Sequence, residues 1–122
     1  MTLGQKQELF GRLLGKLLIR ASGRKRYGCP VGEVFRPPEM CRIYYERGAG
    51  ILHSNHGRKL AVDLYLSYDG KVVWDAAHYR WLGDYWHGLD PLCRWGALIK
   101  DGGDFRSRND PYHFSLQHGK YI

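Results

Sequence analysis

Two short polar motifs contain the residue types that bind a catalytic metal ion. In the first, His56 precedes an apolar segment and Asp63 lies within that segment. In the second, His113 follows Asp110 at a distance of three residues. Two imidazoles and one carboxylate form an open zinc site, which leaves a coordination position for water. The pattern therefore predicts that His56, Asp63 and His113 hold Zn²⁺ for a hydrolytic reaction.

The seven-residue separation of His56 and Asp63 requires a bend in the chain. In one continuous strand, an odd separation would direct the two side chains to opposite faces. Gly57 makes such a bend easy. We therefore expect His56 in a loop, with Asp63 and His113 on neighbouring strands. The residues alone also allow a simpler interpretation, in which His56 is an ordinary loop histidine, Asp63 faces solvent and Asp110 caps a turn.

Further side chains fit the catalytic and substrate-binding roles of such a site. Asp110 is the expected general acid/base, because a carboxylate beside the metal ion can pass a proton to the leaving amine. Arg36 is expected to hold a substrate carboxylate, since a guanidinium group binds carboxylates bidentately. Trp95 belongs to a glycine-bounded segment before Asp110, and we expect it at the rim of the site.

Hydrophobic periodicity predicts three helices around these motifs. The first has a capping box at its start, in which Thr2 is followed by Gln5. Its leucine-rich stripe predicts packing against a core rather than on a membrane. The helices are expected from Thr2 to about residue 23, over residues 39–47, and between the cap Asp75 and Gly88.

Period-two alternation predicts about four short strands. In residues 60–67, Val62 and Leu64 share one face while Asp63 lies on the other. Asp69-Gly70 predicts a hairpin turn. The strands are expected at 33–36, 60–67, 71–74 and 111–117, with an irregular segment at 89–103. These elements predict a small α+β fold, with about three helices packed on one face of a small antiparallel sheet.

Length and composition indicate one globular domain over residues 1–122. The chain is 43% apolar and 14% aromatic, which excludes a disordered protein. Its three cysteines are odd in number and lack CxxC spacing, so we expect reduced thiols rather than a disulfide framework. No secretory leader and no apolar run long enough for an integral membrane segment are visible. We expect a monomer.

A net charge of +7 suits a polyanionic partner. Nucleic acid, an anionic membrane and an anionic cell-wall polymer all meet this condition. A basic nucleic-acid-binding domain without catalysis, suggested by the basic segment 20–26, is therefore the alternative from another functional class. No nucleic-acid-binding motif is recognisable, so we expect no nucleic-acid partner.

The first motif, Ser54-x-His56-x-x-Lys59-x-Ala61-x-Asp63, resembles the SxHxxGxAxD signature of the M15 zinc metallopeptidases. The second motif, 110–116, is similar to the acidic-x-x-His motif of the same family. Further segments resemble its small phage branch of L-alanyl-D-glutamate endopeptidases; these are 7–10, 35–39, 82–86 and 94–96.

The resemblance implies a peptidoglycan hydrolase with the M15/Hedgehog-like zinc peptidase fold. His56, Asp63 and His113 would be the zinc ligands, with Asp110 as the catalytic acid/base. Further implied roles are substrate binding or polarisation by Arg36 and lining of the site by Ser54. The implied substrate is the peptidoglycan stem peptide, with L-Ala-D-Glu cleavage favoured over D-Ala-D-Ala carboxypeptidase or cross-link cleavage.

The implied biological role is that of a phage endolysin without a separate cell-wall-binding domain. Such an enzyme is made in the host cytoplasm and reaches the cell wall after release by another factor. Three positions depart from the family pattern. Lys59 replaces the motif glycine, Asp110 stands where many members carry glutamate, and Cys41 lies about where relatives often place glutamine.

Overall fold

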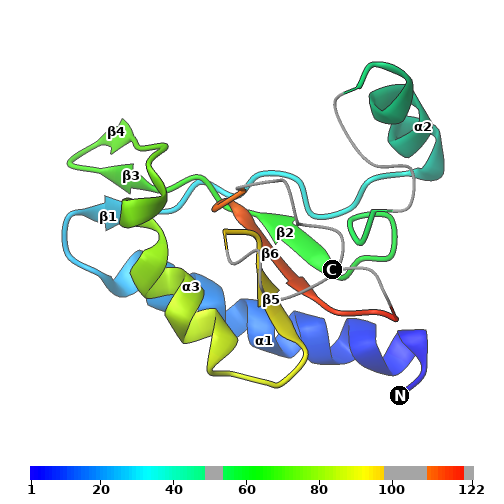
Figure 1. The fold of residues 1–122 in the computed structure, drawn as a ribbon. Coiled ribbons are helices and arrows are strands. Elements are labelled where there is room, and N and C mark those ends of the chain that lie inside the picture. The colour runs from blue at the N-terminus through cyan, green and yellow to red at the C-terminus, as the bar shows by residue number, and fades with distance from the viewer. Residues whose placement is uncertain (49–53, 98–109, 120–122) are drawn as a thin grey trace.

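The computed structural model describes residues 1–48, 54–97 and 110–119. Within them, helices and short antiparallel strands form an α+β fold (Figure 1). Among these residues, no helix is both long and apolar enough to cross a membrane. The helices are α1 (Leu3–Gly23), α2 (Pro38–Glu46), the short 3-10 helix η1 (Ala76–His78) and α3 (Arg80–His87). The strands are β1 (Tyr27–Gly28), β2 (Ala61–Asp63), β3 (Ser67–Tyr68), β4 (Lys71–Val72), β5 (Cys93–Trp95) and β6 (His113–Leu116).

Helix α1 packs its apolar face against the hydrophobic core. Its predicted capping box is confirmed, since the Thr2 hydroxyl accepts from the Gln5 backbone N–H and the Gln5 side chain accepts from the Thr2 N–H. Figure 1 shows α1 running along the sheet with α3 beside it, whereas α2 lies apart from both. The buried stripe of α1 therefore covers a core, as its periodicity predicted; the buried residues are Phe10, Leu13, Leu17 and Ala21.

The central sheet has the order β2-β6-β5, and both pairings are antiparallel. Every residue of β6 is buried. Its Phe114 and Leu116 pack into the same core as Val62 of β2 and Trp86 of α3. Because β6 is the middle strand, it brings the second polar motif against the first.

The second sheet has the order β1-β3-β4 and contains the predicted hairpin. Asp69 and Gly70 both have positive φ, of 51° and 81°. Two consecutive residues with positive φ are typical of the type I′ turn, whose twist matches that of the strands. The buried Tyr79 ties the hairpin to the core, since its hydroxyl donates to the Val73 carbonyl at 2.7 Å and accepts from the Leu66 N–H at 2.9 Å.

The structure corrects several predicted boundaries. Residues 33–36 are not a strand. The backbone at the start of this segment makes two hydrogen bonds with Asp63: the Gly32 N–H donates to the Asp63 carbonyl, and the Glu33 carbonyl accepts from the Asp63 N–H. The prolines that flank the segment lack an N–H and prevent a longer ladder. The predicted strand 60–67 divides into β2 and β3, which belong to different sheets.

Two further corrections concern the segment after the hairpin. The single helix expected between Asp75 and Gly88 is broken at Tyr79, and Asp75 caps η1 rather than α3. Strand β5 lies in a range that was expected to be irregular. Its three residues alternate, with Cys93 and Trp95 buried and Arg94 half-buried, but so short a pattern is not distinctive. The pairing with β6 that stabilises the strand is not visible in the local sequence.

Candidate metal centre

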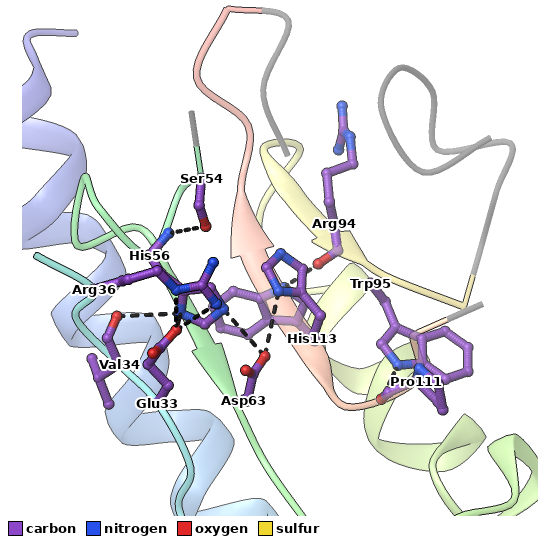
Figure 2. Close-up of polar contacts among 11 residues, drawn as sticks. Glu33, Val34, Arg36, Ser54, His56, Asp63, Arg94, Trp95, Pro111 and His113 are labelled. Carbon is purple, nitrogen blue, oxygen red and sulfur yellow. Dashed lines mark hydrogen bonds and ion pairs between the residues drawn. The ribbon is translucent and has the colours of Figure 1, made fainter. Parts of the chain in front are cut away.

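His56, Asp63 and His113 converge at one end of the central sheet. One ligand atom from each lies within 4.8 Å of the others, and no other metal-binding cluster was found among the described residues. Asp63 Oδ1 is 3.2 Å from His56 Nε2 and 3.4 Å from His113 Nδ1. Figure 2 shows the three side chains directed towards one another. The structure therefore brings together the three residues that the sequence predicted as metal ligands.

The strand register places two of the three residues. Asp63 pairs directly with His113 across β2 and β6, so their side chains lie on the same face. Leu64 continues the chain with its N–H bonded to the Tyr112 carbonyl, which holds this end of the two strands together. A carboxylate and an imidazole anchored on paired strands have little positional freedom.

His56 reaches the same point from a compact series of turns over residues 54–59. The Gly57 and Leu60 N–H groups bond to the Ser54 and Asn55 carbonyls at 3.0 and 2.9 Å. The predicted bend over residues 57–59 is present, and its residue with positive φ is Lys59, at 58°. A left-handed residue before β2 explains how side chains seven positions apart share a face.

Neighbouring groups orient the His56 imidazole. Its Nδ1 lies 3.4 Å from the Val34 carbonyl oxygen and 3.8 Å from Glu33 Oε1. A proton on Nδ1 can be donated to that carbonyl, which leaves Nε2 free to bind a metal ion. Ser54 contacts the backbone of His56 rather than its ring, since the Ser54 hydroxyl accepts from the His56 backbone N–H at 3.1 Å. Sequence reasoning missed Glu33 and Val34, for which no motif gave a signal.

The electrostatics of the cluster suit a divalent cation. Burial alone would raise the pKa of the Asp63 carboxyl, but the interactions with His113 and His56 outweigh burial and hold that pKa below its ordinary value. The buried Oδ1 of Asp63 has no well-formed hydrogen bond. The His56 and His113 side chains are only 3% and 8% exposed. A buried, under-coordinated carboxylate oxygen between two imidazoles fits a zinc ion.

Arg36 lies beside the cluster and is held by two contacts. Its guanidinium donates to Glu33 Oε1 at 2.7 Å and stacks over the Tyr44 ring at 5.0 Å. Its backbone N–H bonds to the His56 carbonyl at 3.1 Å. The Cys41 thiol lies 3.8 Å from the Arg36 carbonyl, so Cys41 packs beneath this segment. Arg36 is thus fixed at the border of the metal centre, where its guanidinium also forms an ion pair with Glu33 at 2.6 Å.

Asp110 stands at the other border of the cluster. Its carbonyl accepts from the His113 N–H at 3.2 Å, and its own N–H bonds to the Gly96 carbonyl at 3.2 Å. A Cβ on Gly96 would come within 2.3 Å of the Asp110 carbonyl, so only glycine allows this approach. The pKa of Tyr65 is raised by burial and then by the charges of Asp63, Asp110 and Glu33. The backbone contacts of Asp110 therefore fix it three residues before His113, next to the metal centre.

The prediction that Trp95 lies at the rim is wrong. Its side chain is buried, with 1% of the residue exposed, and packs on Gly83, where a Cβ would lie 2.3 Å from the indole. The indole Nε1–H donates to the Pro111 carbonyl at 2.8 Å. Trp95 is therefore a core residue that holds the Asp110–His113 turn. His53, a weaker candidate in the sequence, lies outside the described residues.

Comparison with known proteins shows which fold carries this cluster. No protein-family model matches the chain, and no curated protein matches it. Among solved structures, it is similar to the L-Ala D-Glu endopeptidase ChiX of Serratia marcescens, with a TM-score of 0.63 and 24% identity over 88% of this chain and 77% of that one. It is also similar to a variant of the vancomycin resistance D,D-pentapeptidase VanY in complex with Zn(II), with a TM-score of 0.57 and 19% identity over 88% and 70%. At these identities the likeness establishes the fold, and the predicted α+β class is confirmed.

Proposed function

We propose that this chain is a zinc-dependent peptidase of the M15 type, which hydrolyses a peptide bond in the stem peptide of peptidoglycan. The observation that carries the proposal is the convergence of His56, Asp63 and His113 on the sheet of this fold. The fold is shared with two peptidases, one of them in complex with Zn(II). The sequence motifs and the geometry favour the same ligand set.

The proposed roles combine the residue types with the geometry of the three-residue cluster. His56, Asp63 and His113 would hold the zinc ion. Zinc in such a site supplies Lewis acidity, which polarises the peptide carbonyl and lowers the pKa of attacking water. Asp110 accepts the proton of that water and donates it to the leaving amine. Arg36 orients the substrate through a carboxylate.

We favour cleavage of the L-Ala-D-Glu bond, the reaction that names the ChiX endopeptidase. A D,D-peptidase specificity, that of VanY, is the second candidate. Arg36 serves either reaction, since both substrates carry a carboxylate near the cleaved bond.

An endolysin-like role is part of the proposal. The enzyme would act as a monomer, and another factor would release it from the host cytoplasm to the wall. The net charge of +7 favours attraction to anionic envelope polymers. In the basic segment 20–26, Arg24 and Arg20 stack over the Trp81 ring at 4.6 and 5.6 Å, and Arg26 pairs with Asp69. These contacts favour a structural role for that segment over nucleic-acid binding.

One experiment tests the function and the bond. Purified protein is analysed for zinc and then incubated with purified peptidoglycan, with and without a chelator. Mass spectrometry of the products identifies the new ends. New D-Glu amino ends that disappear with chelator support the proposal, and new D-Ala ends support the second candidate. A protein that binds no divalent metal at micromolar concentration, or cleaves equally well with chelator, would refute the zinc peptidase.

A further inference from the structure

Three aromatic rings next to the metal centre form a compact cluster, here termed the aromatic ledge. It consists of Tyr65, Trp74 and Tyr112. The ring centroids of Tyr65 and Trp74 are 5.8 Å apart, those of Tyr65 and Tyr112 are 5.6 Å apart, and those of Trp74 and Tyr112 are 5.5 Å apart. Each ring thus supports the other two, at distances where aromatic pairs attract.

The ledge is fixed by the surrounding backbone. The Tyr112 hydroxyl donates to the Trp74 carbonyl at 2.6 Å, and the Tyr112 ring packs edge-on against the buried Tyr79 at 5.1 Å. The Tyr65 ring lies over Gly32, where a Cβ would come within 2.3 Å of it. Rings held in this way lose little conformational entropy when a ligand binds.

The ledge borders the metal centre. Tyr65 follows the ligand Asp63 by two residues, and Tyr112 immediately precedes the ligand His113. The Leu64 N–H bonds to the Tyr112 carbonyl at 2.9 Å, so these flanking segments stay paired beyond β2 and β6. The ledge therefore lies beside the strand ends that carry two of the proposed metal ligands.

The exposed face of the ledge is apolar and carries no stacked cation. Trp74 is 59% exposed. Arginines or lysines stack on other rings, including Trp81, Tyr68 and Tyr44, but within the described residues none stacks on the ledge. An exposed indole of this size is costly to hydrate, and Trp is typical of binding hot spots.

A pyranose fits these conditions. Its C–H face is apolar and flat enough to cover an indole, and an N-acetylated sugar ring carries no charge of its own. In the stem peptide, L-Ala is attached directly to such a sugar through a lactyl group. The sugar therefore lies one residue from the L-Ala-D-Glu bond but several residues from a D-Ala-D-Ala bond.

We propose that the aromatic ledge is a sugar subsite, in which Trp74 binds the N-acetylated pyranose of the glycan strand that bears the stem peptide. The subsite rests on the proposed peptidase function and deepens it. It selects the first bond between two amino acids after the glycan, because a bound sugar places the L-Ala-D-Glu bond over the metal centre. It also predicts that glycan-linked peptides are better substrates than free peptides.

The test compares two substrates and three variants. The substrates are the stem tetrapeptide linked to N-acetylmuramic acid and the same tetrapeptide without the sugar. The variants are Trp74→Ala, Trp74→Phe and the control Tyr45→Ala, whose ring is 57% exposed on α2. Wild type should prefer the glycan-linked substrate by about tenfold in kcat/KM, mainly through KM. Trp74→Ala should abolish this preference, Trp74→Phe should keep part of it, and Tyr45→Ala should keep all of it.

A binding measurement does not depend on activity. The disaccharide of N-acetylglucosamine and N-acetylmuramic acid, with its lactyl carboxyl group amidated as it is in the substrate, is titrated into chelator-treated protein and followed by NMR. The Trp74 indole N–H signal should shift in wild type and Tyr45→Ala, whereas Trp74→Ala should lose binding. A substrate preference that survives in Trp74→Ala, or disaccharide binding that Trp74→Ala retains, would overturn the subsite. A wild type that cleaves neither substrate would instead overturn the peptidase function, and the titration would still test the ledge.

Discussion

Asp63 and His113 face each other across the antiparallel pairing of β2 and β6, with Oδ1 and Nδ1 3.4 Å apart. Fifty residues separate them in the chain, yet the register of one strand pair fixes both. A shift of one residue in that register would turn one side chain to the opposite face of the sheet. The buried apolar residues of β6 therefore determine the geometry of the metal centre as well as the stability of the core.

Asp63→Asn should lose zinc. The substitution keeps the shape of the side chain but removes the charge that offsets the cation. Since loss of a supporting residue around a metal site already costs 10- to 100-fold in affinity, loss of this ligand should cost at least about 100-fold. Metal analysis and chelator competition would measure the loss. Asp84→Asn, at an exposed carboxylate on α3, is the matched control; equal zinc affinity in both variants would remove Asp63 from the ligand set.

Asp110→Asn should keep zinc but lose turnover. The amide can still form hydrogen bonds, but it cannot carry the proton from water to the leaving amine. The expected fall in kcat is about 10²- to 10⁴-fold. Zinc content and kcat are measured on the same preparation. An Asp110→Asn enzyme that retains the wild-type rate would contradict the assigned role.

Arg36→Lys should weaken substrate binding. Lysine keeps the charge but loses both the bidentate geometry and the stacking on Tyr44. We expect KM to rise by about 10-fold or more, since hydrogen bonds to charged groups contribute about 1.5–3 kcal/mol. Arg42→Lys, at an exposed position of α2, is the control. Wild type and Arg36→Lys should differ much less on a substrate whose carboxylate is amidated; an undiminished difference would show that Arg36 does not bind that group.

Lys59→Gly should stabilise the protein. Lys59 has a φ of 58°, in the left-handed region that a side chain disfavours. Glycine removes this strain, and we expect a gain of about 1 kcal/mol in the free energy of unfolding. Urea denaturation would measure it. Lys59→Ala removes the same contact with Phe35 but keeps a Cβ, so a gain as large in the alanine variant would mean that φ is not the cause.

Tyr79→Phe should destabilise the protein by about 1–3 kcal/mol, because it leaves the Leu66 N–H and the Val73 carbonyl without their partner. Burial raises the pKa of Tyr79 from 10.0 to about 12, despite an opposing effect of the Leu66 hydrogen bond. The folded state thus retains a proton that the unfolded state releases. This contribution is complete below pH 10 and is lost as the pH rises through 12.

Denaturation at pH 8 and pH 11 separates the two effects. Wild type should lose more stability than Tyr79→Phe between these pH values, because only wild type has the Tyr79 hydroxyl whose pKa is raised in the folded state. A difference between the two proteins that is independent of pH would contradict the assignment of the raised pKa to Tyr79.

The sequence by itself determined the local features of this protein. The capping box of Thr2 and the hairpin turn at Asp69-Gly70 depend on neighbouring residues, and both formed where predicted. The residue types of the metal centre were also readable, because imidazoles and carboxylates at these spacings imply ligand chemistry before any fold is known. Lys59 stands where the signature that the first motif resembles has glycine. Its left-handed backbone conformation, which glycine adopts most easily, explains that preference.

Only the tertiary structure decided how distant residues meet. Strand β5 exists because β6 pairs with it, and a three-residue strand has too few side chains to show a distinctive pattern. Trp95 became a core residue because Gly83 on α3 leaves space for its indole. Glu33 and Val34 contact His56 through a segment without regular structure. Contacts of this kind depend on packing between segments far apart in the chain, whereas sequence patterns report mainly the conformation within each segment.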